Sequence, residues 1–549
     1  MKSLMLSLVL FGLCVTAFGQ HHQTTSEVKP TQAAPLMSGL GKHFHPVSAR
    51  NAEAQQFFNQ GLTLVYGFNH AEAIRSFARA AELDPQLAMA YWGIALATGP
   101  NYNETEIDAT RKKAAFEAVQ KALSLAANAP EQERAYIEAL AKRFAADPQA
   151  DSKKLAVDYK NAMNALVKRY PDDLDAAVLH ADSAMILNAW KLWTPDGKPA
   201  EGTEEIVALL ESVLARDPNH IGANHFYIHA VEASPRPECA LPSADRMAIL
   251  TPSAGHLVHM PAHIYMRIGN YEAAAKSNDL AAKADRAYIE SIGASGIYAA
   301  FYYSHNLHFL AAARNMQGRY ADAKRAAEQL ENNVRPFMKD LPMLDAFMPT
   351  STFLMIRFQR WDDILKTPEP NREMIITNAL WHWGRAMAYA ATGKIANAEK
   401  ERDVFASAVK VMAAELSFGI NRANDVLKIG AYMLDAKIAT AKGNRTLAIE
   451  LLKKAVEAED ALAYDEPPAW YYPPSRESLG GALLLNGNAE EAEKVFRADL
   501  EKNRRNGRSL FGLLESLKAQ GKKYSAQSVQ REFEEAWKQA DTKLRVEDL

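Results

Sequence analysis

The chain has 549 residues, of which 48% are apolar and 23% are charged, a composition typical of a soluble, well-packed protein. Its length exceeds what one compact core usually fills. Lys and Arg number 63 against 66 Asp and Glu, so the formal net charge is −3. There is no basic excess to replace the counterions of a phosphate backbone, which argues against nucleic-acid binding.

The first twenty residues have the pattern of an export signal. MKSLMLSLVLFGLCVTAFGQ combines an early lysine, an apolar stretch from Leu4 to Phe18 and small residues before Gln20. We predict a cleavable secretory signal peptide over residues 1–19, cut near Gly19, and a periplasmic or secreted protein. A membrane anchor is less favoured, because the run is shorter than the ~20 residues that span a bilayer. No later segment is apolar enough to anchor the mature chain.

Residues 20–45 are polar and contain proline and serine, which predicts a flexible leader before the folded part of the chain. Once the signal is removed, Cys239 is the one remaining cysteine. No intramolecular disulfide can then form, and we expect this residue to be a small buried hydrophobe.

From residue 57 onward, large and small residues recur at fixed offsets. The first unit contains Phe57, Gly61, Leu64, Ala73, Phe77, Ala80 and Pro85. Tyr91, 34 residues after Phe57, opens a second unit. Later units carry a glycine followed five residues on by an alanine, as in Gly269/Ala274, Gly318/Ala323, Gly393/Ala398, Gly443/Ala448 and Gly487/Ala492. Internal periodicity of this length indicates a repeat of two interlocking helices.

This pattern resembles the tetratricopeptide repeat (TPR) superfamily over nearly the whole mature length. The resemblance implies an all-α superhelical solenoid of stacked antiparallel helix pairs over residues 46–549, with a concave groove lined by the first helix of each pair. FNQGLTLVYGFNHAEAIRSFARAAELDP, AMAYWGIALATGPNYN and HLVHMPAHIYMRIGNY are also similar to a group of exported bacterial proteins with this repeat. Co-chaperone members clamp peptide termini with Lys, Asn and Arg on the groove face, where this chain has histidine.

Histidines gather in the central repeats, over about residues 220–330. The seven are His225, His229, His256, His259, His263, His305 and His308. The steps from His225 to His259 and from His229 to His263 are both 34 residues, one repeat. Positions three or four apart share one face of a helix. We therefore expect these imidazoles, together with Glu232, to line the concave groove.

This residue pattern predicts a metal site. Histidines four apart on one helix chelate a divalent ion, and a neighbouring helix at about 8–10 Å supplies further ligands. We predict a divalent transition metal (zinc, copper or iron) bound by the seven histidines, three to four for each ion, with Glu232 as a ligand or as the base for metal-bound water. Arg267, Tyr303 and Asn306 are expected to contact a substrate.

Whether the chain is an enzyme stays open at this point. If it is one, it is a metal-dependent hydrolase or oxidase acting on a small molecule or a peptide. The sequence carries no nucleotide, flavin or covalent haem motif. The alternative is a periplasmic scaffold that binds a protein or peptide in the groove without metal, with the histidines as a polar lining.

Other features carry structural expectations. We expect His180, His220 and His382 to be structural or solvated. A kink is expected at Met260-Pro261, inside a central helix. Two segments rich in aromatic residues and proline, residues 190–199 and 464–474, interrupt the helices. For the second we favour a rigid turn between repeats over a loop that laps over the groove.

Overall fold

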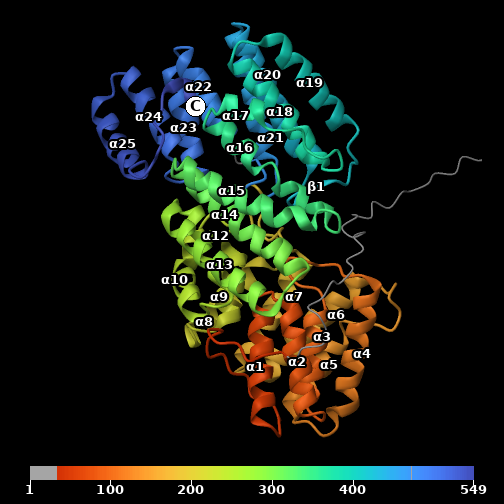
Figure 1. Cartoon of the computed structure of the whole chain (residues 1–549). Helices are drawn as coiled ribbons and strands as arrows, with labels where there is room; N and C mark the ends of the chain where they lie inside the picture. Colours follow the sequence, from red (N-terminus) through yellow and green to blue (C-terminus); the bar gives the residue numbers. More distant parts are fainter. Residues whose placement is uncertain (1–33, 471–472) are drawn as a thin grey trace, which may run out of the picture.

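The computed structural model describes residues 34–470 and 473–549, and its regular structure is almost entirely helical (Figure 1). The predicted signal peptide lies outside the described residues. Within those residues the only strands are the short pair β1 (Ser417–Phe418) and β2 (Asn421–Arg422), which are antiparallel. Each described helix is too short or too polar to cross a membrane.

The N-terminal half is a series of helices that pack on one another in chain order. They are α1 (Ala52–Tyr66), α2 (His70–Leu83), α3 (Ala88–Thr98), α4 (Ala109–Ala126), α5 (Glu131–Ala141), α6 (Ser152–Arg169), α7 (Leu174–Leu187), α8 (Thr203–Arg216), α9 (Ile221–Val231) and α10 (Leu241–Leu250). Several begin at a side-chain cap; Asn69, for example, accepts a hydrogen bond from the Glu72 amide at the start of α2.

The remaining helices continue the same arrangement. They are α11 (Gly255–His259), α12 (Pro261–Arg267), α13 (Tyr271–Ile292), α14 (Tyr303–Met316), α15 (Tyr320–Val334), α16 (Thr350–Arg357), α17 (Trp361–Lys366), α18 (Ile375–Ala391), α19 (Ile395–Lys410), α20 (Ala423–Ala441), α21 (Arg445–Asp460), α22 (Ser475–Leu485), α23 (Ala489–Lys502), α24 (Gly507–Ala519) and α25 (Lys523–Ala536). The predicted kink is present, because α11 and α12 are separate helices that meet at Met260.

The repeat pattern has a direct structural cause. A Cβ on Gly61 would lie 2.7 Å from the Phe77 ring, and Gly93 in the next repeat meets the same ring. Near the other end of the chain, Phe496 fits in the same way against Gly480 and Gly512. Large residues therefore fill spaces that only glycine leaves open, and the helices interlock. The protein is an all-α, TPR-like solenoid, as the sequence predicts.

The glycines that mark the later repeats lie in the turns between paired helices. Their φ angles are positive, between 71° and 84°, a region where a side chain is strained. These turn glycines are Gly269, Gly318, Gly393, Gly443 and Gly487.

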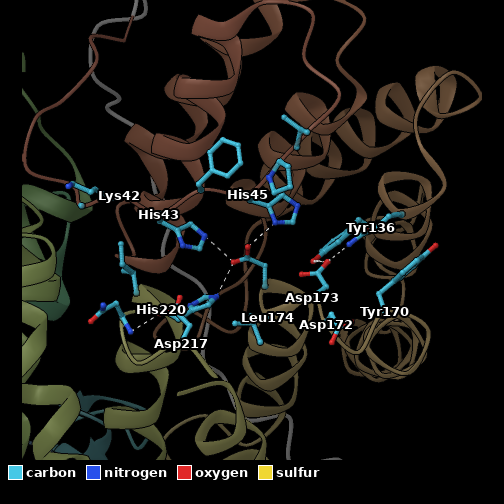
Figure 2. A pocket seen from close by; sticks show the side chains of 18 of the residues that line it. Lys42, His43, His45, Tyr136, Tyr170, Asp172, Asp173, Leu174, Asp217 and His220 are labelled. Atoms are coloured by element: carbon cyan, nitrogen blue, oxygen red, sulfur yellow. Dashed lines mark hydrogen bonds and ion pairs between the residues drawn. The ribbon is translucent and has the colours of Figure 1, made fainter. Parts of the chain in front are cut away.

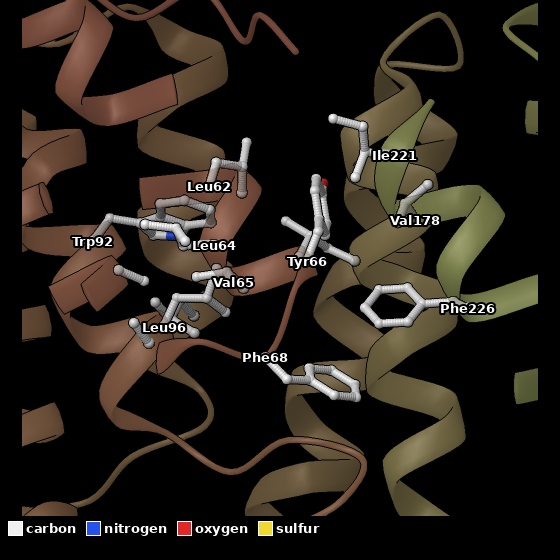
Figure 3. Close-up of a cluster of buried hydrophobic side chains, with 14 of the residues drawn as sticks. Leu62, Leu64, Val65, Tyr66, Phe68, Trp92, Leu96, Val178, Ile221 and Phe226 are labelled. Atoms are coloured by element: carbon white, nitrogen blue, oxygen red, sulfur yellow. The ribbon is translucent and has the colours of Figure 1, made fainter. Parts of the chain in front are cut away.

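Two large hydrophobic cores run through the two halves. The first joins α1 to α12 and includes Tyr66, Phe68 and Phe226 (Figure 3). The second joins α12 to α25 around Trp383 and Trp470, whose rings are 5.2 Å apart. The end of the chain packs back on the middle, because the Trp537 ring fills the space over Gly318 and the Asp541 amide donates to the Gly318 carbonyl.

The expected flexible leader does not extend over residues 34–45, which pack along the ends of the N-terminal helices. Leu40 and His45 are buried. The Met37 amide donates to Gln60 Oε1 at 2.7 Å, and the Ser253 amide donates to the Gly39 carbonyl at 3.0 Å. Polar composition suggested a free segment, but the buried Gln60 side chain in α1 and the backbone after α10 give these residues hydrogen-bond partners.

Candidate metal centre

Three neighbouring parts of the solenoid carry the predicted histidines. Helix α9 provides His225 and His229, α11 and α12 provide His256, His259 and His263, and α14 provides His305 and His308. These segments are adjacent in the middle of the molecule (Figure 1). The structure thus brings together histidines that the repeat spacing placed at equivalent positions.

The expected open groove is wrong at this place, because most of the histidines are buried. The exposed fraction is 2% or less for His225, His229, His256, His259 and His263. His305 and His308 are half-buried.

Aromatic rings close over the imidazoles. Phe68 packs on His256 with 5.3 Å between ring centroids, and Phe309 packs on His259 and His263 at 4.6 and 4.7 Å. The short turn between α1 and α2, which carries Phe68, and helix α14, which carries Phe309, thereby cover the face that would otherwise be an open groove.

Six of the seven histidines form two groups of three. The first triad is His225, His229 and His256, and the second triad is His259, His263 and His305. Within each triad, one nitrogen of each ring lies within 4.8 Å of the corresponding atoms of the other two. Ligands of one ion at about 2 Å from the metal are separated by distances of this order. His308 belongs to neither triad and packs on Phe347.

The hydrogen bonds of the first triad fix where the ring protons lie. His225 Nδ1 is 2.5 Å from the Tyr66 main-chain carbonyl, which can only accept, so Nδ1 carries the proton. His229 Nδ1 is 2.7 Å from a Glu232 oxygen in the same way. Among the described residues, neither Nε2 has a partner, and His256 has none for either nitrogen. Buried nitrogens without a partner are rare in folded proteins.

The second triad shows the same pattern more sharply. His259 Nδ1 is 2.7 Å from Asn278 Oδ1, and the Asn278 amide is oriented by its donation to the Ala274 carbonyl. His263 Nδ1 is 2.5 Å from Glu232 Oε2. The Nε2 atoms of His259 and His263 face each other at 3.0 Å, and both are acceptors whenever the Nδ1 of each ring holds the proton. Two acceptors at that distance repel unless a cation or a proton lies between them.

Burial disfavours the charged form of five of the triad imidazoles. Burial, helped by the neighbouring imidazoles, lowers the pKa of His225, His256, His259 and His305 well below the usual value. The pKa of His229 is also lowered by burial, against the opposing effect of Glu232. Metal ligands must be unprotonated at the coordinating atom, and that is the state favoured here.

Glu232 lies between the triads and uses both carboxylate oxygens. Oε1 accepts from His229, and Oε2 is close to His263 and accepts from the Tyr464 hydroxyl at 3.1 Å. Burial raises its pKa, but His263 and His229 outweigh this and hold the pKa below the usual range. A carboxylate so engaged is a weak base. Its geometry is that of the outer carboxylates that orient ligating histidines.

The segment after α21 reaches this carboxylate. Tyr464 comes from the aromatic and proline-rich stretch of residues 464–474, and its hydroxyl contacts Glu232 across 232 positions of sequence. The interpretation that we favoured, a rigid turn between repeats, is therefore wrong at Tyr464, because this residue reaches Glu232 in the central repeats.

The residues expected to contact a substrate have structural partners instead. Arg267 Nε donates to the Glu232 main-chain carbonyl at 3.0 Å. The Tyr303 hydroxyl accepts from Arg286, and Asn306 Nδ2 donates to Asp285 at 2.6 Å. His382, expected to be structural, is 2.6 Å from Glu401.

Sequence reasoning missed a second histidine cluster. A pocket of about 1460 Å³ opens between residues 39–48 and the first residues of α5, α7 and α9 (Figure 2). His43, His45 and His220 surround the Asp175 carboxylate at 3.0, 2.8 and 3.3 Å. Two of these histidines fell in the predicted leader. No signal in the sequence pairs them with an aspartate 130 residues away.

The position of the ring proton on His220 distinguishes this cluster from the triads. The Ala223 amide donates to His220 Nδ1 at 3.2 Å, as the cap of α9, so in the neutral ring the proton lies on Nε2. That Nε2 points to Asp175 and has no lone pair to offer a metal. The Tyr66 hydroxyl donates to the same carboxylate at 2.5 Å. We call this group of four residues around the Tyr66 hydroxyl (His43, His45, Asp175 and His220) the Asp175 anchor.

Comparisons with known proteins add little beyond the fold. No protein-family model matches the chain, and no curated protein matches it. Solved structures with some likeness include the human IFIT1 dimer with m7Gppp-AAAA (13% identity, 90% of this chain and 92% of that one, TM-score 0.33) and yeast Tom70 (12%, 88% and 90%, 0.29). The TPR domain of P58(IPK) is a third (11%, 86% and 99%, 0.22).

Proposed function

We propose that this chain is an exported metal-binding protein whose two histidine triads each hold one divalent transition-metal ion. The contact between His259 Nε2 and His263 Nε2 carries the proposal. These two buried nitrogens lie 3.0 Å apart. The His259 ring is fixed by the hydrogen bond of its Nδ1 to Asn278, Glu232 lies 2.5 Å from His263 Nδ1, and a cation between the two Nε2 atoms would satisfy both of them.

The surroundings support metal binding in three further ways. Burial favours the neutral form of five triad imidazoles, the outer nitrogens of His225, His259 and His229 are bonded to Tyr66, Asn278 and Glu232, and five of the six rings are buried. Outer hydrogen bonds of this kind fix the ring orientation and raise ligand basicity. All-imidazole ligation suits zinc, copper or iron, and geometry rather than sequence decides among them.

The site favours holding a metal over transforming a large substrate. Five of the six triad histidines are buried, and the large pocket is lined by residues of the Asp175 anchor, not by the triads. A peptide substrate would have to displace Phe68, Phe309 and Tyr464 to reach the ligands. Chemistry at this centre is therefore limited to very small molecules or to electron exchange.

Elemental analysis of the exported, tagless protein tests the proposal. We expect near-stoichiometric zinc, copper or iron for each triad. His225→Ala/His256→Ala is expected to empty the first triad and His259→Ala/His263→Ala the second. His180→Ala/His382→Ala, which changes two histidines outside the triads, is the matched control and is expected to keep the full content.

Absence of bound metal would refute the proposal. If the wild-type protein holds no metal after exposure to Zn²⁺, Cu²⁺ and Fe²⁺, and none of them raises its melting temperature, the metal proposal fails. The solenoid is then a metal-free scaffold for a protein or peptide. Export is tested separately by the N-terminal sequence of the mature protein, for which we expect a start at Gln20.

A further inference from the structure

The segment between α21 and α22 is held by the C-terminal half. The Asn421 side chain donates to the Ala463 carbonyl at 3.1 Å and accepts from the Ala463 amide at 2.9 Å. Farther along, Trp470 is buried against Trp383 and Phe353. Tyr464 lies between these two fixed points, so its position is set by the C-terminal repeats.

The tyrosine ends on the carboxylate that joins the two triads. Its hydroxyl donates to Glu232 Oε2 at 3.1 Å, and the Arg267 guanidinium lies over its ring at 5.4 Å. Arg267 also binds the Glu232 main-chain carbonyl. The Glu232 side chain is thus held by Tyr464 from the C-terminal half of the molecule. Its main-chain carbonyl is held by Arg267, which belongs to the repeat that carries the second triad.

On this basis we propose that Tyr464 is a positioning residue through which the C-terminal half of the solenoid regulates how tightly the histidine triads hold metal. The inference rests on the proposed function, since it concerns the same centre. It gives the C-terminal half a role in metal retention, in addition to its packing against the central repeats.

The chemistry of the contact explains the effect. Glu232 Oε1 keeps a proton on Nδ1 of His229, which leaves Nε2 of that ring free for a metal, and Glu232 Oε2 lies 2.5 Å from His263 Nδ1. A donor on Oε2 stabilises the carboxylate in its ionised form and fixes its orientation. Burial, followed by the charge of Glu232, raises the pKa of Tyr464, so the phenol stays protonated and remains a donor.

Tyr464 also stands in the way of metal exchange. Its ring lies between Arg267 and the Glu232 carboxylate, and the segment that carries it is anchored on both sides. The Tyr464 hydrogen bond opposes any turn of Glu232 away from His229 and His263, and we expect a bound ion to be released more slowly while Glu232 is held there.

Chelator-driven release from the full-length chain loaded with Zn²⁺ or Co²⁺ tests the role. We expect Tyr464→Phe to release metal about 10-fold faster than wild type, within the range seen for outer-shell changes. The control is Tyr389→Phe, which removes a phenol bonded to Arg385 in the same C-terminal half. We expect it to release metal at the wild-type rate. Equal rates for all three proteins overturn the proposal.

A second measurement needs no metal and separates this proposal from the proposed function. In the metal-free protein with ¹⁵N-labelled histidine, Tyr464→Phe is expected to shift the ring nitrogens of His229 and His263 but not those of His225, whose partner is Tyr66. Unchanged spectra overturn the positioning role even if the protein binds metal. Shifted spectra in a protein that binds no metal sustain the Tyr464–Glu232 link and defeat only the metal centre.

Discussion

The histidine triads and the cluster around Glu477 are both buried and polar, yet their donors and acceptors are matched very differently. In the C-terminal half, Glu477 accepts from Arg357 at 2.5 Å and from Arg508 at 3.0 Å, and Asn506 adds a third bond. Each oxygen of that carboxylate has a donor. In the triads, His225 Nε2, His229 Nε2 and both nitrogens of His256 have no partner among the described residues. The matched cluster needs no further group, whereas the unpartnered nitrogens of the triads are part of what supports the proposed metal centre.

The largest expected effect breaks the matched cluster. Glu477→Ala leaves two buried guanidinium groups without their carboxylate, which destabilises a protein by about 3–5 kcal/mol. Urea unfolding of the metal-free protein measures this. The surface variant Asp158→Ala, which loses an i,i+4 contact with Lys154, is expected to change stability by less than about 1 kcal/mol. A loss at Glu477 no larger than at Asp158 would show that the cluster is not structural.

The next effect concerns the mismatched cluster. Metal at 100 times its Kd is expected to stabilise the wild-type protein by about 3 kcal/mol. His256→Leu removes a ring with two unpartnered nitrogens, so the share of the stabilisation that metal gives through the first triad is lost while the metal-free protein is as stable as wild type or more stable. Thermal unfolding with and without Zn²⁺ gives both numbers. Strong destabilisation of the metal-free variant would mean that His256 is an ordinary packing residue.

An intermediate effect is expected at Asp182, another buried group of the N-terminal half. Burial raises its pKa from 3.8 to about 6, with Arg143 opposing the change. The folded protein therefore keeps a proton that the unfolded chain releases near pH 4, and stability falls as pH rises from about 4 to 6 and is level above that. Asp182→Asn is expected to flatten this slope and to stabilise the protein at pH 7.5 by about 1–3 kcal/mol.

The check at Asp182 is a series of urea unfolding curves from pH 4.5 to pH 7.5. The surface variant Asp279→Asn, whose carboxylate pairs with Lys283, serves as the control and is expected to keep the wild-type slope. Parallel curves for wild type and Asp182→Asn would contradict the raised pKa.

The smallest effect separates the triads from the Asp175 anchor. Tyr66→Phe removes the hydroxyl that donates to Asp175 but leaves the main-chain carbonyl that accepts from His225. We expect a loss of about 1–2 kcal/mol in unfolding free energy with no change in metal content. Calorimetry and elemental analysis on the same sample measure the two. A loss of metal in this variant would show that the anchor and the triads are one site.

The sequence predicted those parts of the molecule that depend on local period. Gly61 and Phe77 are spaced by the geometry of two helices, and the 34-residue step from His225 to His259 sets equivalent positions in successive repeats. The spacing of residues along the repeat predicts which of them lie on the same helix face. It does not say what covers that face, and therefore an open groove was expected where Phe68 and Phe309 close it.

What the sequence did not reveal depends on contacts between distant segments. His43 and Asp175 are far apart in the chain, as are Tyr464 and Glu232. Neither pair has a spacing that a helix or a repeat imposes. Ring tautomers are equally hidden, because they follow from partners such as Asn278 and the Ala223 amide that only the folded chain brings near.

Tyr66 ends α1 with one group at each of two histidine clusters, its phenol at Asp175 and its carbonyl at His225. Tyr66 therefore links the two clusters rigidly. Its ring rests on Gly222, where a Cβ would come within 2.7 Å. Any side chain at position 222 therefore displaces Tyr66. This displacement disturbs the Asp175 anchor and the first triad together, although the new side chain touches no histidine of either cluster. In a mutational scan, we therefore expect one small substitution at position 222 to perturb the Asp175 anchor and the first triad at the same time.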